Sequence, residues 1–227
     1  MPAGLQQLDT APDLVDRAYR ALLDAISDGQ LAPGQRLTQE ELAEQLSVSR
    51  QPVLQALRLL KAERFVLDAP GRGLQVAPLD AQWIREVYEV RSALDAQAAR
   101  LAARRGGRPR GTPVIDPRLL ETGRKASRGR SVYALIEADL AFHSAIYMAA
   151  DNPLLTQTAH QHWRHIRRAM GAVLKSSLRR ETIWDEHEAI AVAIDHGDGE
   201  KAARLMLGHG EQASRHLAEQ LAAEPRP

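Results

Sequence analysis

Residues 38–53 read TQEELAEQLSVSRQPV and indicate the fold of the N-terminal part of the chain. The first half of this stretch is typical of a helix start, because Thr38 is followed three residues later by Glu41. In such a capping box the threonine hydroxyl accepts a hydrogen bond from a backbone N–H of the first turn, and the glutamate reaches back. A tight connection, Ser47-Val48-Ser49, follows, so the stretch predicts a short helix that ends near Leu46.

The second half of the stretch begins another helix. Ser49 is a good N-cap, and Pro52 falls in the first turn, where the missing backbone N–H of proline does no harm. We therefore expect a helix over residues 50–63. An earlier amphipathic helix is predicted over residues 12–29, where apolar residues recur at helical spacing until Gly29 ends the pattern.

Two short runs after these helices have the composition of strands. They are Phe65-Val66-Leu67 and Leu74-Gln75-Val76, and they flank a turn-rich tip, Asp68-Ala69-Pro70-Gly71-Arg72-Gly73. These runs are the only convincing strands in the sequence. Three helices, of which the last two are joined by a tight turn, followed by a β-hairpin, describe a winged helix-turn-helix.

The third helix of such a module is long enough to lie in a major groove of DNA, which is about 12 Å wide. The candidate DNA-contacting residues are Arg36, Ser49, Arg50, Gln51, Arg58 and Arg72. Arg50 is the strongest of them, because the N-terminus of a helix also favours phosphate. Residues 10–78 carry eight basic and nine acidic side chains, a net charge of −1, so nonspecific attraction to the phosphates of DNA is expected to be weak. A winged helix that contacts only other proteins is therefore an alternative.

After Asp80 the sequence has the periodicity of helices alone. The expected helices cover residues 80–105, 116–127, 131–150, 153–178, 180–197 and 199–222. We therefore expect a mainly α protein with two domains. The winged helix-turn-helix (three helices plus a β-hairpin) covers residues 10–78, and an all-helical bundle that holds an effector site covers residues 79–222.

The composition excludes several classes of protein. The chain has 227 residues, no cysteine, and 30 basic against 29 acidic side chains, so neither a disulfide framework nor the overall charge identifies a partner. No run of about 18 apolar residues occurs, and the first residues lack the features of a secretory signal. We therefore expect a cytoplasmic protein that makes no contact with a membrane. Any metal ion must be bound by histidine, aspartate or glutamate.

Polar side chains interrupt the apolar stripes of three C-terminal helices. Asp139 and His143 lie one turn apart on one stripe, and His187 and His209 lie on the stripes of two later helices. A lone inward histidine is more often a hydrogen-bonded core residue than a metal ligand, and a buried aspartate is costly unless it is paired or bound to a metal. One carboxylate and three imidazoles together predict a metal site between helices. Zn²⁺ suits these ligands best, with Mn²⁺, Ni²⁺ or Fe²⁺ as alternatives.

An arginine interrupts a fourth stripe. Arg91 lies among Ile84, Val87 and Leu94 in the first helix of the bundle. A buried guanidinium needs an anionic partner, and binding a carboxylate through two hydrogen bonds is its natural geometry. Arg91 is therefore a candidate for binding a small organic acid. A local pair with Asp95, one turn later, is an equally good interpretation.

The N-terminal residues resemble the GntR family of bacterial regulators over about residues 10–78. The resemblance rests on Gly29-x-Leu31-x-Pro33-Gly34, Leu37, Glu41-Leu42-Ala43, Val48-Ser49-Arg50-x-Pro52-Val53 and Ala56-Leu57. The family usually has Arg-Glu where this chain has Leu54-Gln55, and a glycine where it has Arg64. Since that arginine is typically a DNA contact in the family, one expected hydrogen bond to DNA is missing.

The C-terminal residues resemble the FCD effector domain of a large GntR subfamily over about residues 80–222. The resemblance rests on Asp139-x-x-Phe142-His143, Asn152, Glu186-His187-x-x-Ile190 and His209. It implies that Asp139, His143, His187 and His209 bind a metal ion, since these four positions match the ligands of that subfamily. It also implies a homodimer, and a repressor as the commoner arrangement.

Together these features predict a DNA-binding regulator that responds to a ligand, and not an enzyme. A small organic acid would complete the coordination of the metal and shift the two winged helices of a dimer relative to palindromic half-sites. Two alternatives stay open. One is a metal-dependent enzyme with Glu186 or Glu188 as general base, although the sequence has no motif for a nucleophile or a phosphate loop. The other is a regulator whose signal is the metal ion itself.

Overall fold

The structure is a computed structural model that describes residues 14–104, 112–174 and 182–223. The chain divides into two compact units, with the division between Pro78 and Leu79. Each unit has its own hydrophobic core. Among the described residues, no helix is long and apolar enough to cross a membrane.

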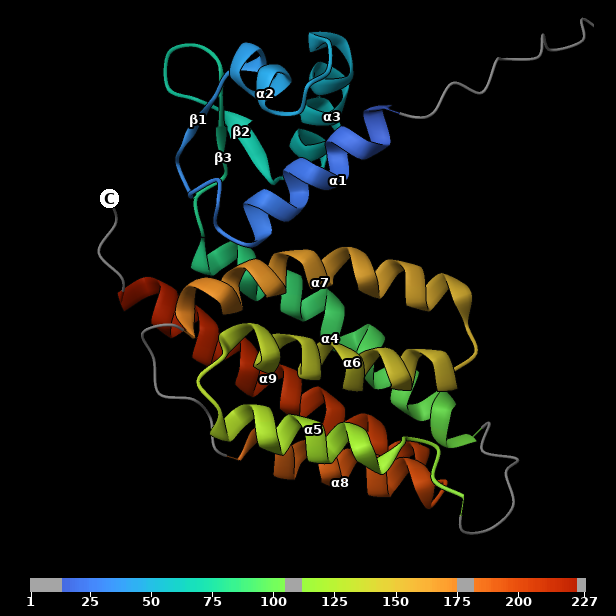
Figure 1. Cartoon of the computed structure of the whole chain (residues 1–227). Helices are drawn as coiled ribbons and strands as arrows, with labels where there is room; N and C mark the ends of the chain where they lie inside the picture. The colour runs from blue at the N-terminus through green and yellow to red at the C-terminus, as the bar shows by residue number, and fades with distance from the viewer. Residues whose placement is uncertain (1–13, 105–111, 175–181, 224–227) are drawn as a thin grey trace, which may run out of the picture. The chain divides into compact units, whose positions relative to one another are not determined.

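Over its described residues, the first unit combines three helices with a small sheet (Figure 1). Its elements are α1 (Leu14–Ser27), β1 (Arg36–Leu37), α2 (Gln39–Gln45), α3 (Arg50–Ala62), β2 (Val66–Asp68) and β3 (Leu74–Val76). Both α1 and α2 pack against α3. The core between them is made of apolar side chains such as Ile26, Leu57 and Leu60, which helical spacing turns inward. The unit is the winged helix-turn-helix predicted from the sequence.

The local sequence explains how α2 and α3 begin. The Thr38 hydroxyl accepts a hydrogen bond of 3.3 Å from the backbone N–H of Glu41, as the capping box predicts. Ser49 is the N-cap residue of α3, although its hydroxyl makes no capping hydrogen bond. Pro52 is buried in the first turn, where a missing N–H costs no helical hydrogen bond. The turn between the two helices passes through Ser47, whose φ of 52° lies in the left-handed region.

The residue after the C-cap of α3 also has a left-handed backbone. Arg64 adopts a φ of 61°, a conformation that favours glycine because a side chain crowds the following carbonyl there. The resembled family usually has glycine at this position, and the backbone conformation gives a physical reason for that preference. An arginine at this position is therefore under mild backbone strain.

The sheet has one strand more than the sequence predicted. β3 is the central strand and pairs antiparallel with β2 on one side and with β1 on the other. β1 consists of Arg36 and Leu37 alone, so it is too short to show the alternation that marks a strand in a sequence. It pairs with β3 after the chain turns at Gly34, which has a φ of 79°. β2 covers Val66–Asp68 instead of the predicted residues 65–67.

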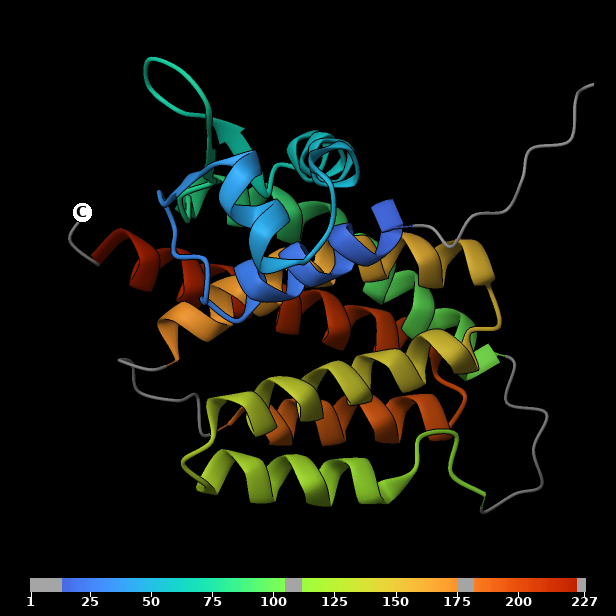
Figure 2. The same cartoon turned by 45° about the horizontal axis from the view of Figure 1, so that its top comes forward.

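The second unit is a helical bundle, with no strand among its described residues. Its helices are α4 (Ala81–Arg104), α5 (Pro117–Arg128), α6 (Val132–Ala149), α7 (Pro153–Val173), α8 (Ile183–Asp195) and α9 (Gly199–Ala223). α4 contacts α6, α7, α8 and α9, and it runs beside α9 along much of its length (Figure 1). α5 packs against α6 and α8 (Figure 2). Side chains from most of the helices therefore meet in one core.

Two helix ends differ from the prediction by more than two residues. The sequence predicts a helix over residues 153–178, whereas α7 ends at Val173. It predicts the next helix from residue 180, whereas α8 begins at Ile183. The difference falls on residues 175–181, which lie outside the described part of the chain. Apolar spacing locates the body of a helix better than its ends, where the last turns contribute little to the stripe.

Two glycines allow helices of the bundle to approach closely. A Cβ added at Gly123 of α5 would lie 2.0 Å from the ring of Trp184 in α8. A Cβ added at Gly210 of α9 would lie 2.2 Å from the hydroxyl oxygen of Ser92 in α4. Non-bonded atoms do not approach this closely in a packed core, so only glycine fits at either position. These contacts set the spacing of α5, α8, α4 and α9.

Candidate metal centre, cavity and DNA-contacting residues

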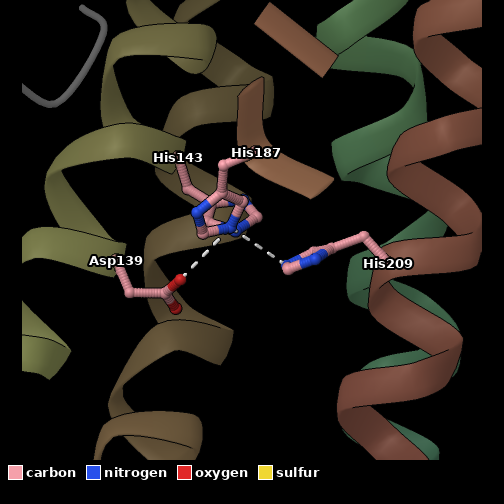
Figure 3. A group of neighbouring side chains, drawn as sticks. All are labelled: Asp139, His143, His187 and His209. Atoms are coloured by element: carbon pink, nitrogen blue, oxygen red, sulfur yellow. Dashed lines mark hydrogen bonds and ion pairs between the residues drawn. The ribbon is translucent and has the colours of Figure 1, made fainter. Parts of the chain in front are cut away.

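The four predicted metal ligands meet in the core of the second unit (Figure 3). α6 carries Asp139 and His143 one turn apart, while α8 carries His187 and α9 carries His209. One ligand atom from each residue lies within 4.8 Å of all the others, and all four residues are buried. The structure thus brings together the four side chains that the sequence placed on inward faces.

The distances between the ligand atoms suit a single ion. Nε2 of His187 lies 3.4 Å from Oδ1 of Asp139 and 3.3 Å from Nε2 of His209. Ions such as Zn²⁺ bind nitrogen and oxygen at about 2.0–2.2 Å, which places neighbouring ligand atoms roughly 3–4 Å apart. A cation between these three residues would therefore need only small shifts of their side chains.

Two carboxylates outside this group each approach the Nδ1 atom of one of the imidazoles. Oε2 of Glu186 lies 2.9 Å from Nδ1 of His209, and Oδ2 of Asp95 lies 3.5 Å from Nδ1 of His143. A carboxylate beside Nδ1 favours the tautomer with its proton on that nitrogen, which leaves the lone pair on Nε2. In both residues Nε2 is then the nitrogen able to bind a cation.

The surroundings of His143 fit a cation most clearly. Its side chain is fully buried, and Nε2 has no hydrogen-bond partner among the described residues. Burial lowers the pKa of His143 well below its ordinary value, and the positive charge of Arg91 and the neighbouring imidazoles add to this effect. A neutral imidazole with an unused lone pair is the form that binds metals. The donor set therefore fits a divalent ion.

A cavity of about 50 Å³ adjoins two of the four candidate ligands. Asp139 and His209 contribute to its lining, together with Arg91 and His216, and most of the remaining lining is apolar. His216 was not predicted to belong to the site. It lies two turns after His209 on the same face of α9, and this spacing was the available signal. The cavity has room for a small polar group beside the ligands.

Arg91 of α4 forms a buried ion pair and also lines the cavity. It is buried with 2% of its surface exposed, and its Nε lies 3.0 Å from Oδ2 of Asp95, so the local pair considered from the sequence is present and buried. Its guanidinium also stacks on Trp163, with 4.0 Å between Cζ and the ring centre. Nη2 has no hydrogen-bond partner among the described residues. Arg91 therefore pairs with Asp95, lines the cavity and has a donor atom that is not used by the described residues.

The other partners of Asp95 were not predicted from the sequence. The Tyr147 hydroxyl donates a hydrogen bond to Oδ1 of Asp95, and it accepts one of 3.0 Å from Nε1 of Trp163. Burial raises the pKa of Tyr147, so the hydroxyl keeps its proton and acts as a donor. Tyr147 lies one turn after His143 on α6, a spacing that indicates a shared face but no specific partner.

The candidate DNA contacts of α3 lie on the surface of the first unit. Ser49, Arg50 and Gln51 are exposed at the start of the helix, and Arg58 is exposed two turns later. Arg50 pairs with Glu40 of α2 at 2.5 Å, and both side chains are exposed. Such pairs contribute about 0–1 kcal/mol, so a phosphate can take the place of Glu40 at little cost.

The remaining candidates, Arg72 and Arg36, lie in or beside the hairpin tip, residues 68–73, which we name the wing. Arg72 is exposed at its end. Arg36 lies in β1 and donates hydrogen bonds to the backbone carbonyls of Pro70, at 2.8 Å, and of Arg72, at 3.3 Å. Arg72 thus projects from the wing, whereas Arg36 braces it, a position that the sequence did not indicate.

Known protein families match both units. Residues 14–76 match the bacterial regulatory proteins of the gntR family, and residues 86–212 match the FCD domain. The second match alone covers more than half of the chain. The order of the two matches is the order of the two units in the structure.

Individual relatives align along most of their length. The HTH-type transcriptional regulator LutR of Bacillus subtilis is 30% identical over 207 residues, which are 81% of this chain and 92% of that protein. The galactonate operon transcriptional repressor of Escherichia coli is 28% identical over 233 residues, which are 90% of this chain and 96% of the repressor. The Nta operon transcriptional regulator of Aminobacter aminovorans is 29% identical over 177 residues, which are 78% of this chain and 81% of that regulator.

Solved structures share the fold. E. coli McbR/YncC has a TM-score of 0.72 at 24% identity, over 91% of this chain and 98% of that chain. A putative GntR transcriptional regulator from Rhodococcus sp. RHA1 has a TM-score of 0.72 at 23% identity, over 93% and 99%. The chain therefore belongs to the GntR family of bacterial transcription regulators, carries an FCD domain as its second unit, and is not an enzyme.

Proposed function

We propose that this regulator is a repressor that a small organic acid releases from DNA, and that the acid binds beside a metal ion in the second unit. Residues 10–78 form the DNA-binding domain, and residues 79–222 form the domain that binds the metal and the effector. The regulator acts in the cytoplasm as a homodimer, whose two winged helices contact the half-sites of a palindromic operator.

The observation that carries the proposal is the buried meeting of one carboxylate and three imidazoles from three helices. Asp139, His143, His187 and His209 offer ligand atoms within 4.8 Å of one another. Such groups are costly to bury unless they are paired or bound to a cation. Zn²⁺ fits this nitrogen-rich set best, and Mn²⁺, Ni²⁺ and Fe²⁺ are the alternatives that the metal content of the purified protein distinguishes.

Arg91 and the cavity support an organic acid as the effector. An ion that accepts five or six ligands has positions left when four come from the protein. A carboxylate at such a position would accept a hydrogen bond from the unused Nη2 donor of Arg91, at the edge of the same cavity. The E. coli relative is named as the repressor of a galactonate operon, and galactonate is itself a carboxylate.

The DNA-binding part of the proposal assigns two surfaces of the first unit. The residues proposed to contact DNA or to position a contact are Arg36, Ser49, Arg50, Gln51, Arg58 and Arg72. Those on α3 enter the major groove, because they lie at the start and along the exposed face of the helix. Arg72 approaches the backbone or the minor groove from the wing.

Metal content and DNA binding measured on the same preparation test this function. Elemental analysis should find about one divalent ion per chain, as expected for one four-ligand site. Operator sequences are obtained by selecting bound duplexes from a random pool. Binding is then measured with apo protein, with metal-loaded protein, and with metal-loaded protein in the presence of a panel of small organic acids.

We expect one acid to weaken operator binding by at least about tenfold, and only when the metal is present. A response to the metal with no response to any acid would identify the metal ion itself as the signal. A purified protein that neither contains nor takes up a divalent metal would overturn the proposed function.

A further inference from the structure

We infer that Asp95 links the metal site to the effector-binding arginine, so that the metal ion and a carboxylate bind cooperatively. The inference rests on the proposed function, because it concerns the same metal and the same class of effector. It adds a positioning residue that touches neither of them: Asp95 would act through His143 on one side and through Arg91 on the other.

The carboxylate of Asp95 is shared between these two residues. Asp95 is buried, with 2% of its surface exposed, on the face of α4 that packs against α6. Its Oδ2 lies 3.0 Å from Nε of Arg91 and 3.5 Å from Nδ1 of His143. One oxygen atom therefore approaches both the proposed effector-binding residue and a proposed metal ligand.

The other oxygen of the same carboxylate is held in place. Oδ1 accepts the hydrogen bond of Tyr147, whose oxygen accepts a hydrogen bond from Trp163 at 3.0 Å. The ring of Trp163 in turn stacks on Arg91, with 4.0 Å between Cζ and the ring centre. These contacts form a closed ring of four side chains, so a shift of Asp95 toward His143 changes the position or the pairing of Arg91.

The chemistry of a bound cation gives the direction of the effect. A metal ion held at Nε2 of His143 would withdraw electrons from the ring and make the N–H at Nδ1 a stronger donor, which would attract Oδ2 of Asp95. Arg91 would then share the Asp95 carboxylate with His143. Less of the positive charge of Arg91 would be neutralised, so Arg91 would attract an incoming anion more strongly. Because coupling between two ligands is reciprocal, a carboxylate bound at Arg91 must strengthen metal binding by the same factor.

The chain offers a matched control. Glu186 approaches Nδ1 of His209 at 2.9 Å, as Asp95 approaches His143, but it belongs to the first turn of α8 and not to the ring of side chains around Arg91. Both carboxylates are therefore expected to orient an imidazole, and removing either is expected to weaken metal binding about 10–100-fold. Only Asp95 should carry the link to the carboxylate.

The experiment measures the affinity for Zn²⁺ by competition with a chelating dye, with and without saturating acetate as the carboxylate probe. The wild type, Asp95→Asn and Glu186→Gln are compared. In the wild type we expect acetate to tighten Zn²⁺ binding by about fivefold or more. Glu186→Gln should bind Zn²⁺ more weakly but keep the full effect of acetate, whereas Asp95→Asn should keep only the part that comes from direct contact between acetate and the metal ion.

The possible failures are distinguishable. A wild type that binds no Zn²⁺ overturns the proposed function, and the inference with it. A wild type that binds Zn²⁺ without any effect of acetate overturns the inference alone. An effect of acetate that is as large in Asp95→Asn as in the wild type shows that the two ligands communicate without this residue and also overturns the inference.

A second variant covers the case in which Asp95→Asn does not fold because the Arg91 charge is left buried. Tyr147→Phe deletes only the hydroxyl that holds Oδ1 of Asp95 and keeps every charge. We expect the effect of acetate to fall by at least about threefold, the size of one lost hydrogen bond. The absorption spectrum of the Co²⁺-loaded variant should stay that of the wild type, because its four ligands are intact. An unchanged acetate effect in this variant contradicts the inference.

Discussion

Arg50 in the first unit and Arg91 in the second both pair with a carboxylate, but in opposite surroundings. The side chains of Arg50 and Glu40 are 66% and 65% exposed, whereas those of Arg91 and Asp95 are each 3% exposed. An exposed pair contributes about 0–1 kcal/mol, since water competes for both charges. Breaking a buried pair costs about 3–5 kcal/mol, since it leaves a charge without compensation.

This difference extends to the two units as a whole. The candidate DNA contacts lie on the surface above an apolar core, whereas the candidate metal ligands are part of a core. A substitution at a candidate DNA contact should therefore change binding with little effect on folding. A substitution at the metal centre should change sensing and stability together. Substitutions in the two units can test or refine this contrast, and the greatest change is expected at the metal centre.

His187→Ala should abolish stable metal binding. Its imidazole approaches both Asp139 and His209, so its loss leaves an incomplete site in the middle of the core. We expect Zn²⁺ affinity to fall by more than about 100-fold, together with the thermal stabilisation that bound Zn²⁺ gives. Elemental analysis and thermal denaturation with and without Zn²⁺ measure both. His196→Ala, at the exposed C-cap of α8, is the control, and full metal occupancy in His187→Ala would rule out the four-ligand site.

Gly123→Ala should destabilise the second unit by about 1–3 kcal/mol, because the new methyl group overlaps the ring of Trp184. Trp184 also lines the cavity, so the variant should disturb effector binding although it touches no ligand. Gly208→Ala in α9 is the matched control, since nothing lies within 4 Å of its new Cβ. It should stabilise the helix by about 0.5–1 kcal/mol. Chemical denaturation gives both values, and equal effects of the two substitutions would contradict the packing argument.

Arg50→Ala should weaken operator binding by more than about tenfold, the loss expected for one charge-assisted hydrogen bond. Its melting temperature should stay close to that of the wild type, because the pair with Glu40 is exposed. Binding titrations at physiological salt and thermal denaturation check the two halves of the prediction. Lys61→Ala, which removes an ion pair with Asp68 at the other end of α3, is the control for a lost surface charge. If the Arg50→Ala protein keeps wild-type affinity, the start of α3 does not contact DNA in the proposed way.

Arg36→Ala and Arg72→Ala should each weaken operator binding by about 3–10-fold, and the double variant should be little weaker than either single one. The Arg72→Ala variant would lose a phosphate contact. The Arg36→Ala variant would lose the two hydrogen bonds that hold the wing in the position from which Arg72 makes that contact. Residues that act through one contact are not additive. Titrations of the three variants form the double-mutant cycle. Fully additive losses would show that Arg36 contacts DNA independently of the wing.

Arg64→Gly and Asp151→Gly should each stabilise their unit by up to about 1 kcal/mol, since both positions have positive φ values, 61° and 48°. The effect should be similar in the two units, because backbone strain does not depend on whether the functional residues of a unit are exposed or buried. Denaturation curves measure it. Glu63→Gly, with a φ of −88° beside Arg64, is the control and should be destabilising. Destabilisation of Arg64→Gly would mean that its side-chain contacts outweigh the strain.

Several parts of this structure could be predicted because their cause is local. The capping box at Thr38 starts α2 whatever the rest of the chain does, because the hydroxyl and the N–H that it binds are three residues apart. The inward positions of His143 and His187 follow from helical spacing, since side chains one turn apart share a face. The candidate ligands could therefore be named without a structure.

Other parts could not be predicted because they depend on contacts between distant segments. β1 has no pattern of its own and exists through its pairing with β3. Arg36 could be identified as a candidate for DNA contact, but not as the residue that braces the wing. Asp95 could be paired with Arg91 on the same helix, whereas its approach to His143 depends on how α4 packs against α6.

Helical periodicity and end-capping act over a few residues, so the sequence alone predicts which side chains of each helix face the core and where most helices begin. The packing of the helices brings the inward carboxylate and imidazoles within reach of one ion, and it places Asp95 between Arg91 and a proposed metal ligand. The physical reason is that the distance between helices is set by packing, as where Gly210 allows α9 to approach Ser92 of α4, and packing is a property of all the helices together.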